Sequence, residues 1–203
     1  LAVAQVNISQ VRSLALSRYG PDTARLVDDW QTGIETMSSL PDAEKLALAN
    51  RFFNSHIRWA EDPQAWGEED YWATPLELMG RGMGDCEDFA IAKYLTLILA
   101  GVDVDKLRIT YVKARIMGSG DVKNTAHMIL AYYPSATEEP LILDNLITDI
   151  RPASQRPDLT PVYGFNSKGL WVGHATAPAT TRPGTKLSRW RNLLRRASAE
   201  GLG

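Results

Sequence analysis

The chain has 203 residues, of which 44% are hydrophobic and 23% are charged. A chain of this length buries about 70% of its unfolded surface, which is enough for one substantial core. Its 22 Lys and Arg residues against 24 Asp and Glu residues give a formal net charge of −2, which excludes a general nucleic-acid-binding surface. No apolar run approaches the roughly 20 residues that span a bilayer, so the chain is not expected to be integral to a membrane. A single cysteine excludes an internal disulfide and any site built from several thiolates.

The first 60 residues are predicted to be helical. Apolar residues at helical spacing follow Pro21, and a second amphipathic helix is predicted from Pro41, where a missing N–H costs nothing. The polar stretch 60–70, which contains Pro63 and Gly67, is predicted to be a loop.

A third helix is predicted to begin after Thr74, which can cap it while Glu77 reaches back to the N–H of the capping residue. Glycines at positions 80, 82 and 84 then break this short helix. Residues 89–100 are apolar on nearly every side, which predicts a helix buried in the middle of the fold. Gly101 is expected to end that helix.

Beyond Gly101 the pattern changes to strands. The segments 107–112, 127–133 and 141–143 are short and rich in branched and aromatic residues, with turn-like clusters between them. Helices followed by strands predict an α+β domain with a mainly antiparallel sheet.

The C-terminal part is predicted to be a linker with a short basic helix after it. We divide the chain into a domain over residues 1–173 and a tail over 174–203, in which residues 174–185 have the composition of a linker. The basic helix could dock on an acidic membrane surface, contact a partner or fold back onto the domain. Its modest apolar stripe favours folding back, and the stripe consists of Leu187, Trp190, Leu194 and Ala197.

Cys86 is the candidate nucleophile. It lies between the glycine-broken loop and the start of the buried helix, where the exposed N–H groups and the helix dipole favour a thiolate. A thiolate needs a partner that moves protons, and of the three histidines His127 is the best candidate because it lies in a strand-like run.

Asp144 ends the apolar run 141–143 and could hold the imidazole of His127 in the required tautomer. A symmetric hairpin with Tyr133 opposite Leu141 would place His127 and Asp144 on opposite faces of the sheet. We therefore predict an offset of one residue in this hairpin, which brings the two onto one face as diagonal neighbours.

Three acids crowd the candidate nucleophile. Asp85, Glu87 and Asp88 should raise the pKa of the thiol and oppose its ionisation. Either they cap the helix N-terminus, or a hard divalent cation such as calcium lies among them and cancels the repulsion.

Three motifs surround the candidate residues: Gly-Asp-Cys-Glu-Asp-Phe-Ala around Cys86, Ala-His-Met around His127 and Leu-Asp-Asn around Asp144. Together they resemble a known family, the bacterial transglutaminase-like cysteine proteinases of the LapG type. The resemblance runs from about Trp59 to Trp171.

The resemblance implies a papain-related, transglutaminase-like fold with Cys86 as nucleophile, His127 as general base and acid, and Asp144 as orienter. It also implies calcium dependence, with Asp85 and Glu87 as ligands and Asp88 as a weaker candidate. Proteases of this type are periplasmic and release a large surface adhesin by cutting at a pair of alanines near its N-terminus. An inner-membrane receptor that senses cyclic di-GMP holds them inactive.

Other interpretations stay open. A transglutaminase or deamidase would use the same three residues on glutamine side chains, and a binding module would not use them at all. A zinc site is weaker because zinc prefers closely spaced ligand pairs, which the sequence lacks. For peptide cleavage, the Cys86 N–H is expected to be one oxyanion donor, with a second from the neighbourhood of Trp72. Trp66, Tyr71 and Trp72 are candidate walls of a narrow substrate cleft.

Overall fold

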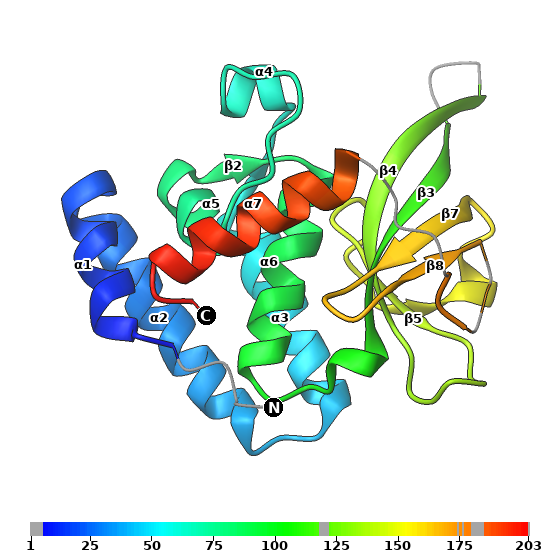
Figure 1. Cartoon of the computed structure of the whole chain (residues 1–203), viewed down its shortest axis with the longest axis horizontal. Helices are drawn as coiled ribbons and strands as arrows, with labels where there is room; N and C mark the ends of the chain where they lie inside the picture. Colours follow the sequence, from blue (N-terminus) through cyan, green and yellow to red (C-terminus); the bar gives the residue numbers. More distant parts are fainter. Residues whose placement is uncertain (1–5, 118–121, 174, 176, 180–184, 203) are drawn as a thin grey trace.

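Helices pack against one side of a six-stranded antiparallel sheet in this computed structural model (Figure 1). The structure describes residues 6–117, 122–173, 175, 177–179 and 185–202. The helices are α1 (Ile8–Tyr19), α2 (Pro21–Ser38), α3 (Asp42–His56), α4 (Asp62–Ala65), α5 (Pro75–Arg81), α6 (Cys86–Leu99) and α7 (Thr185–Ala199), with short 3-10 turns at Val104–Lys106 and Ala153–Gln155.

The sheet has the strand order β6-β5-β4-β3-β7-β8, and every neighbouring pair in it is antiparallel. Its strands are β3 (Leu107–Met117), β4 (Val122–Tyr132), β5 (Leu141–Leu143), β6 (Arg151–Pro152), β7 (Leu159–Phe165) and β8 (Leu170–Val172). Two further strands, β1 (Arg58–Trp59) and β2 (Met83–Gly84), form a separate parallel pair.

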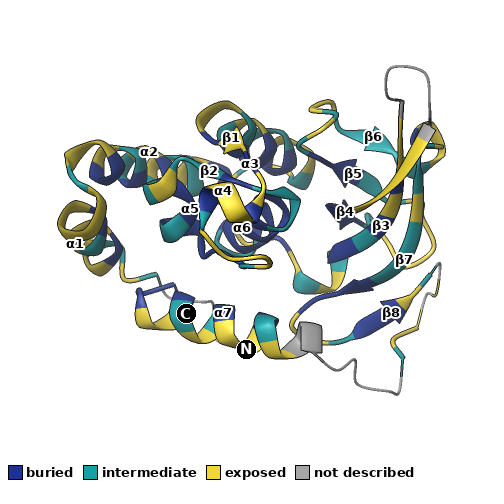
Figure 2. Ribbon diagram, turned by 90° about the horizontal axis from the view of Figure 1, so that it is seen from above, coloured by how far each residue is buried: buried dark blue, intermediate teal, exposed yellow. Residues whose placement is uncertain are grey.

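The main core lies between α6 and the sheet. Helix α6 is buried on nearly every side, as its apolar sequence predicts, and it contacts β4, β3, α3 and α5. A second core joins the helices to one another, and a small third core lies on the sheet face away from α6, because side chains alternate between the faces of β4. Figure 2 shows the helices on one side of the sheet, with each residue coloured by its burial. Helix α6 therefore holds its N-terminus in a fixed place beside β4.

The capping signals of the sequence are confirmed at two helices. Thr74 and Glu77 form a capping box at the start of α5, and Gly82 ends that helix in the left-handed conformation at φ 67°. Asp85 caps α6, again in a capping box, with Asp88 as the reciprocal partner. The capping interpretation of the acids around Cys86 is thus part of the structure.

The predicted offset between the second and third strands is confirmed. Leu130 lies opposite Leu143 and Tyr132 lies opposite Leu141, which is one residue away from the symmetric pairing. Continued by one pair, this register places Asp144 opposite Ile129. Because side chains alternate between the faces of a strand, Asp144 and His127, two positions before Ile129, share one face.

Some elements differ from the prediction. The stretch 60–70, expected to be a loop, contains the short helix α4, and strand β1 immediately precedes it. Strands β6, β7 and β8 were not predicted. For β7 the reason is that it carries Pro161 and Gly164 and that its pairing with β3 shifts register between Tyr111 and Val112.

Helix α7 folds back onto the rest of the chain, which confirms the prediction for the basic tail. Trp190, Leu193 and Ala197 are buried, and the ring of Trp190 contacts Tyr94 and Phe165 edge to face. Of the predicted linker, residues 174, 176 and 180–184 lie outside the described residues, as does the side chain of Leu187. In the described part of the chain, no helix has the length and hydropathy that a membrane crossing requires.

Candidate active site

Cys86 is the first residue of α6, and its thiol faces a cavity. The parallel pairing of β1 with β2 places Trp59 beside Gly84, directly before the helix. The cavity has a volume of about 460 Å³, and both Cys86 and His127 line it. The structure therefore brings together the two side chains that the sequence separates by 41 positions.

His127 lies on β4 and is held by Asp144. Its Nε2 is 2.8 Å from Asp144 Oδ1, and both side chains are buried. Because an ionised carboxylate only accepts, Nε2 donates in this bond, and Nδ1 is left with a lone pair. This is the tautomer that a general base beside a thiol requires.

Asp144 is held in its ionised form by its neighbours. Burial raises its pKa, but hydrogen bonds and charges from His127 and Arg156 outweigh burial and lower the pKa to about 2. Arg156 Nη2 lies 2.7 Å from Oδ2, and the N–H groups of Asn145 and Leu146 donate to Oδ1. Arg156 was not predicted from the sequence, because only the fold brings it to Asp144.

The backbone of Asp144 is fixed as well. Its carbonyl oxygen accepts hydrogen bonds from Lys93 Nζ on α6 at 3.1 Å and from Asn54 Nδ2 on α3 at 2.9 Å. Two helices thus position the residue that orients His127. Burial lowers the pKa of Lys93 to about 7, although the charge of Asp144 opposes this shift.

The surroundings of the Cys86 thiol favour its protonated form, which differs from the expectation drawn from the helix dipole. Burial raises its pKa well above the usual value, and the charges of Glu87 and Asp85 raise it further. The thiol donates a hydrogen bond to Glu87 Oε2 at 2.8 Å, while a backbone hydrogen bond from Met128 acts in the opposite direction. Asp85 and Glu87, which were predicted to oppose ionisation of the thiol, thus raise its pKa.

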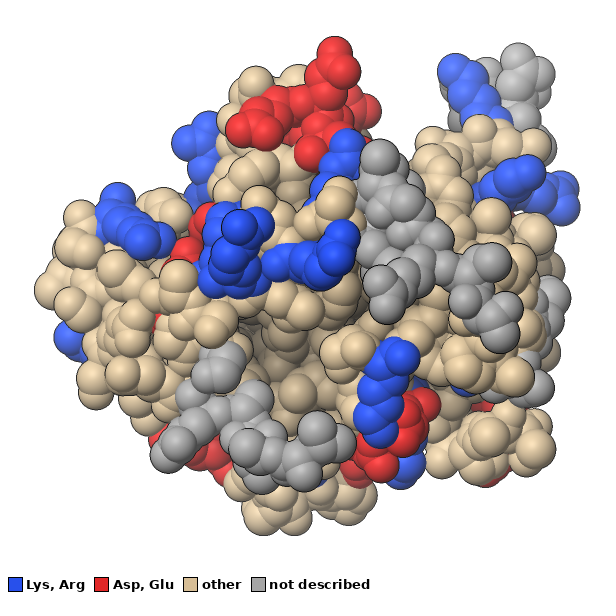
Figure 3. All heavy atoms as spheres, in the orientation of Figure 1, with Lys and Arg blue, Asp and Glu red and all other residues tan. Residues whose placement is uncertain are grey.

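A cluster of four acids surrounds the start of α6. Asp85 and Glu87 flank the thiol, and ligand atoms of Asp62, Asp85 and Asp88 lie within 4.8 Å of one another. Asp62, on α4, was not predicted from the sequence, because its place in the cluster depends on the turn that follows α4. Acidic side chains gather on the surface around α4 and its loop, at the top of Figure 3.

The acids of this cluster are harder to ionise than ordinary carboxyl groups. Burial, together with the charges of neighbouring carboxylates, raises the pKa of Asp62 to about 6, that of Asp88 to about 7 and that of Asp85 to about 10. Such a concentration of buried like charges is stable only if the groups are protonated or share a cation.

Asp88 has its oxygens engaged by protein donors. Oδ1 accepts from the N–H of Ala73 at 2.7 Å, and Oδ2 accepts from Trp66 Nε1 at 3.0 Å. Gly84 permits this arrangement, since a Cβ at that position would lie 2.5 Å from Asp88 Oδ2. The hydrogen bonds give Asp88 a structural role at this turn.

The walls of the cavity differ from those expected. Trp66, Tyr71 and Trp72 do not line it: the rings of Trp66 and Tyr71 contact each other at a tilt of 36°, and Trp72 is buried and stacked on Phe165. The expected second oxyanion donor near Trp72 is therefore not brought to the cavity by that side chain.

Three exposed apolar side chains line the cavity instead. They are Trp59, Leu146 and Ile116, which are 52%, 48% and 42% exposed. Large apolar side chains that remain exposed around a cavity are typical of a binding surface. No local pattern in the sequence distinguishes them from core residues, because they come from β1, β3 and the loop after β5.

Comparisons with known proteins agree with this geometry. A family model described as bacterial transglutaminase-like cysteine proteinase matches residues 29–159. Solved structures of LapG from Legionella pneumophila are 39% identical to this chain; one has a TM-score of 0.78 and covers 95% of this chain and 98% of that one. Its calcium-bound form has a TM-score of 0.80 with 94% and 99% covered, and its EGTA-treated form has 0.79 with 95% and 98%.

A search of curated proteins finds no match. The likeness to LapG confirms the predicted α+β transglutaminase-like fold. Since the family model covers more than half of the chain, the chain belongs to the bacterial transglutaminase-like cysteine proteinases and is a cysteine peptidase.

Proposed function

We propose that the protein is a calcium-dependent endopeptidase with Cys86 as nucleophile, His127 as general base and acid, and Asp144 as orienter. The observation that carries this proposal is the hydrogen bond between His127 Nε2 and Asp144 Oδ1, with His127 and Cys86 on one cavity. A nucleophile, a base and a third group that fixes the base form the arrangement that acyl transfer needs.

In the first half of the reaction, His127 Nδ1 takes the proton of the Cys86 thiol, and the sulfur attacks the carbonyl carbon of the scissile peptide bond. The tetrahedral intermediate collapses as the C–N bond breaks, and His127 passes its proton to the leaving amine. In the second half, His127 deprotonates a water molecule that attacks the thioester. The new carboxyl group leaves, and Cys86 regains its proton.

The backbone N–H of Cys86 is our candidate oxyanion donor. As the first residue of α6, Cys86 has no N–H partner within the helix, and the positive end of the helix dipole lies at this point. A negative oxygen that develops on the attacked carbonyl would be stabilised there.

The acid cluster fits a calcium ion. Asp62 Oδ1 is buried and has no hydrogen-bond partner among the described residues, while Oδ2 accepts from the Tyr71 N–H. Calcium binds carboxylate oxygens in flexible geometry. We propose Asp62, Asp85 and Glu87 as the ligands, and Asp88 as a weaker candidate because protein donors engage both of its oxygens.

When bound, calcium would supply positive charge that cancels the repulsion between these carboxylates and the sulfur. The same residues would then act differently on the thiol. Glu87, whose carboxylate accepts the hydrogen bond of the thiol, would then share its charge with the cation, and the pKa of Cys86 would fall.

We propose a polypeptide substrate that binds in extended form across the cavity. The exposed side chains of Trp59, Ile116 and Leu146 would contact its apolar residues. By resemblance to LapG-type proteases, we propose that this substrate is a large surface adhesin cut at an Ala-Ala pair near its N-terminus. The same resemblance supports a periplasmic location and inhibition by an inner-membrane receptor of cyclic di-GMP.

The test is incubation of the parent protein, Cys86→Ala and Asp144→Asn with an N-terminal adhesin fragment that contains an Ala-Ala pair, followed by mass spectrometry. We expect the parent to release two fragments in calcium, Cys86→Ala to release none, and Asp144→Asn to be slower by roughly 100-fold or more because the histidine tautomer is lost. Addition of EGTA should stop cleavage of the fragment by the parent protein.

The products distinguish peptide cleavage from the alternatives. A new amino terminus within the fragment supports the peptidase, whereas released ammonia or an isopeptide bond would show deamidase or transglutaminase chemistry instead. Cleavage that persists in Cys86→Ala would contradict the assignment of the nucleophile. Cleavage that persists in EGTA would contradict the metal while leaving the three catalytic residues in place.

A further inference from the structure

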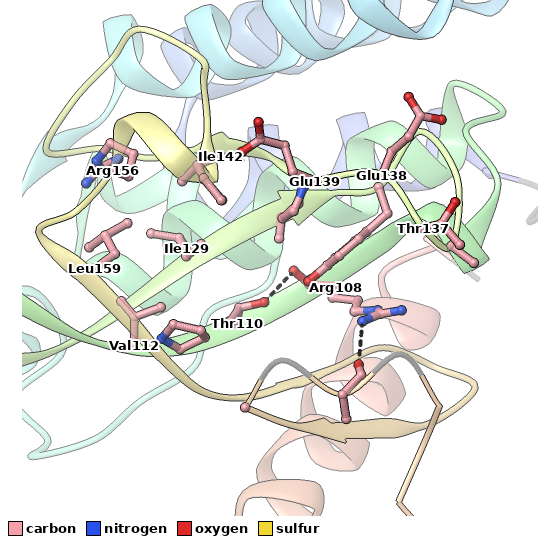
Figure 4. A pocket seen from close by; sticks show the side chains of 18 residues that line it. Arg108, Thr110, Val112, Ile129, Thr137, Glu138, Glu139, Ile142, Arg156 and Leu159 are labelled. Carbon is pink, nitrogen blue, oxygen red and sulfur yellow. Dashed lines mark hydrogen bonds between the residues drawn. The ribbon is translucent and has the colours of Figure 1, made fainter.

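A second cavity lies on the sheet face away from α6. It has a volume of about 400 Å³, which is within the usual range for small-molecule sites. Apolar side chains of β3, β4 and β5 form its floor, and they are the residues of the third core, Val112, Ile129, Ala131 and Ile142. Figure 4 shows Arg108 and Arg156 at opposite ends of the cavity, with Ile129 between them.

Arg108 is a buried cation at one end of this cavity. Its exposed fraction is 7%, and its guanidinium lies between two aromatic rings, 4.0 Å from the centre of Tyr133 and 4.3 Å from that of Trp171. Nη1 donates to the carbonyl oxygen of Ala175, and Nε has no hydrogen-bond partner among the described residues.

Arg108 forms no ion pair with any described carboxylate. The nearest acids on the cavity wall are Glu138 and Glu139, and their carboxylates point away from Arg108 (Figure 4). Glu139 is engaged with Ser154 instead. A buried charge is costly unless it is paired, so the stacked guanidinium of Arg108 is incompletely compensated.

Arg156, at the other end, is paired. Its Nη2 contacts both Asp144 and Asp158, at 2.7 Å and 2.8 Å. The two ends of the cavity therefore differ: among the described residues, Arg156 has two counter-ions and Arg108 has none. An anion that enters the cavity would be drawn to Arg108.

We propose that this cavity binds a carboxylate carried on an apolar body, with the carboxylate at Arg108 and the apolar part over Ile129 and Ile142. A guanidinium held by two rings is preorganised to donate to a carboxylate. The apolar floor supplies the remaining contacts, and a phenyl or short alkyl group fits the available volume. The carboxylate is either that of a free organic acid or the C-terminus of a peptide with an apolar last residue.

The cavity is also connected to the peptidase site. Arg156 lines the cavity and at the same time donates to Asp144, the residue that holds His127. A ligand that fills the cavity contacts a side chain that fixes the orienter. The binding site itself does not depend on the proposed peptidase activity, so the test below reads binding directly.

The experiment is calorimetric titration of the full chain with 3-phenylpropionate, with N-acetylphenylalanine as the mimic of a peptide C-terminus, and with the neutral amides of both. The variants are Arg108→Met, which keeps an unbranched side chain between the rings, and the control Arg115→Met, an exposed arginine on the same strand. We expect Arg108→Met to weaken the binding of at least one of the two carboxylates by about tenfold or more. Arg115→Met should leave the affinity for both unchanged. The amides should bind the parent and Arg108→Met equally weakly.

A second measurement keeps the proposal testable if Arg108→Met does not fold. In the parent, methyl NMR should show shifts of Ile129, Ile142 and Val112 with the carboxylate and smaller shifts with the amide. Binding of only one of the two acids identifies the source of the carboxylate. The proposal is overturned if the amides bind as tightly as the acids, if Arg108→Met binds the acids like the parent, or if neither acid shifts these methyl groups.

Discussion

Asp62 combines deep burial with an oxygen that has no partner among the described residues. The side chain is 5% exposed, and only Oδ2 has a hydrogen bond, from the N–H of Tyr71. A buried polar atom without a partner costs free energy that must be compensated elsewhere. A calcium ion shared with Asp85 and Glu87 would provide this compensation.

The substitution Asp62→Asn should weaken calcium binding by about tenfold or more, because it removes one charged ligand while an amide oxygen can still accept from Tyr71. Calorimetric titration of calcium into the EGTA-stripped protein measures the effect. Glu69→Gln, an exposed acid of the same loop, is the control and should bind like the parent. Equal affinities for parent and Asp62→Asn would remove Asp62 from the ligand set.

Lys93 is a buried cation whose Nζ donates a hydrogen bond to the carbonyl oxygen of Asp144. Its pKa falls to about 7 because of burial, whereas in the unfolded chain it is ordinary, near 10.5. Between these two values the unfolded chain binds more protons than the folded one. The contribution of Lys93 to the free energy of unfolding therefore rises with pH in this window.

Relative to Lys93→Met, the parent should gain stability as pH increases from 7 to 9. The gain is at most about 1.4 kcal/mol per pH unit, since one group titrates. Urea unfolding of both proteins at several pH values measures the difference. An unchanging difference would mean that Lys93 keeps its proton in the folded protein.

At the level of the elements, the N-terminus of α6 gathers the nucleophile, its cap and most of the acid cluster. Much of this could be predicted from the sequence. Capping of the helix by its acids, one of the two interpretations offered for them, follows from local spacing, as do the buried helix and the one-residue offset of the β4–β5 hairpin. His127 and Asp144 were placed correctly on one face for that reason.

Other parts of the site could not be predicted, because they depend on contacts between distant segments. Asp62 joins the cluster from a helix of four residues that resembles a loop in sequence, and Arg156 reaches Asp144 from the short 3-10 turn that follows β6. The exposed apolar side chains that line the cavity come from separate segments, so no periodic pattern in the sequence predicts them. The burial of Asp62 would have been the signal for its role, but only the fold reveals that burial.

The acid cluster should make the EGTA-treated protein less stable as pH rises from 4.5 to 7. Asp62 and Asp88 have pKa values near 6 and 7 in the fold against 3.8 in the unfolded chain. The stability that comes from their bound protons is complete below about 4 and is lost as pH rises through these values. Thermal unfolding in EGTA should show a falling Tm across this window, and the Tm in calcium should fall less. Parallel curves would contradict a shared cation.

At the scale of the whole molecule, α7 closes the fold by joining the helical part to the sheet. Trp190 packs between Tyr94 of α6 and Phe165 of β7, while Arg196 contacts Glu77, Tyr71 and the carbonyl oxygen of Trp72. Basic side chains along α7 form a band across the face of the molecule in Figure 3. The helix therefore has an apolar inner face and a charged outer one.

We expect Trp190→Ala to lower the free energy of unfolding by about 3–5 kcal/mol, because it removes a buried aromatic ring from the main core. Arg191→Ala, an exposed neighbour on the same helix, should change it by less than about 0.5 kcal/mol. Urea unfolding monitored by circular dichroism compares the two. Similar stabilities of Trp190→Ala and the parent would show that α7 is dispensable for the core.

The hydrogen bond from the Cys86 thiol to Glu87 has a consequence for oxidation and alkylation of the sulfur before it meets substrate. Peroxides and alkylating agents attack sulfur mainly after it has lost its proton. Because its surroundings favour the S–H form, the sulfur of Cys86 is expected to react slowly with such agents. The contact with Glu87 would therefore preserve the nucleophile until it ionises for catalysis.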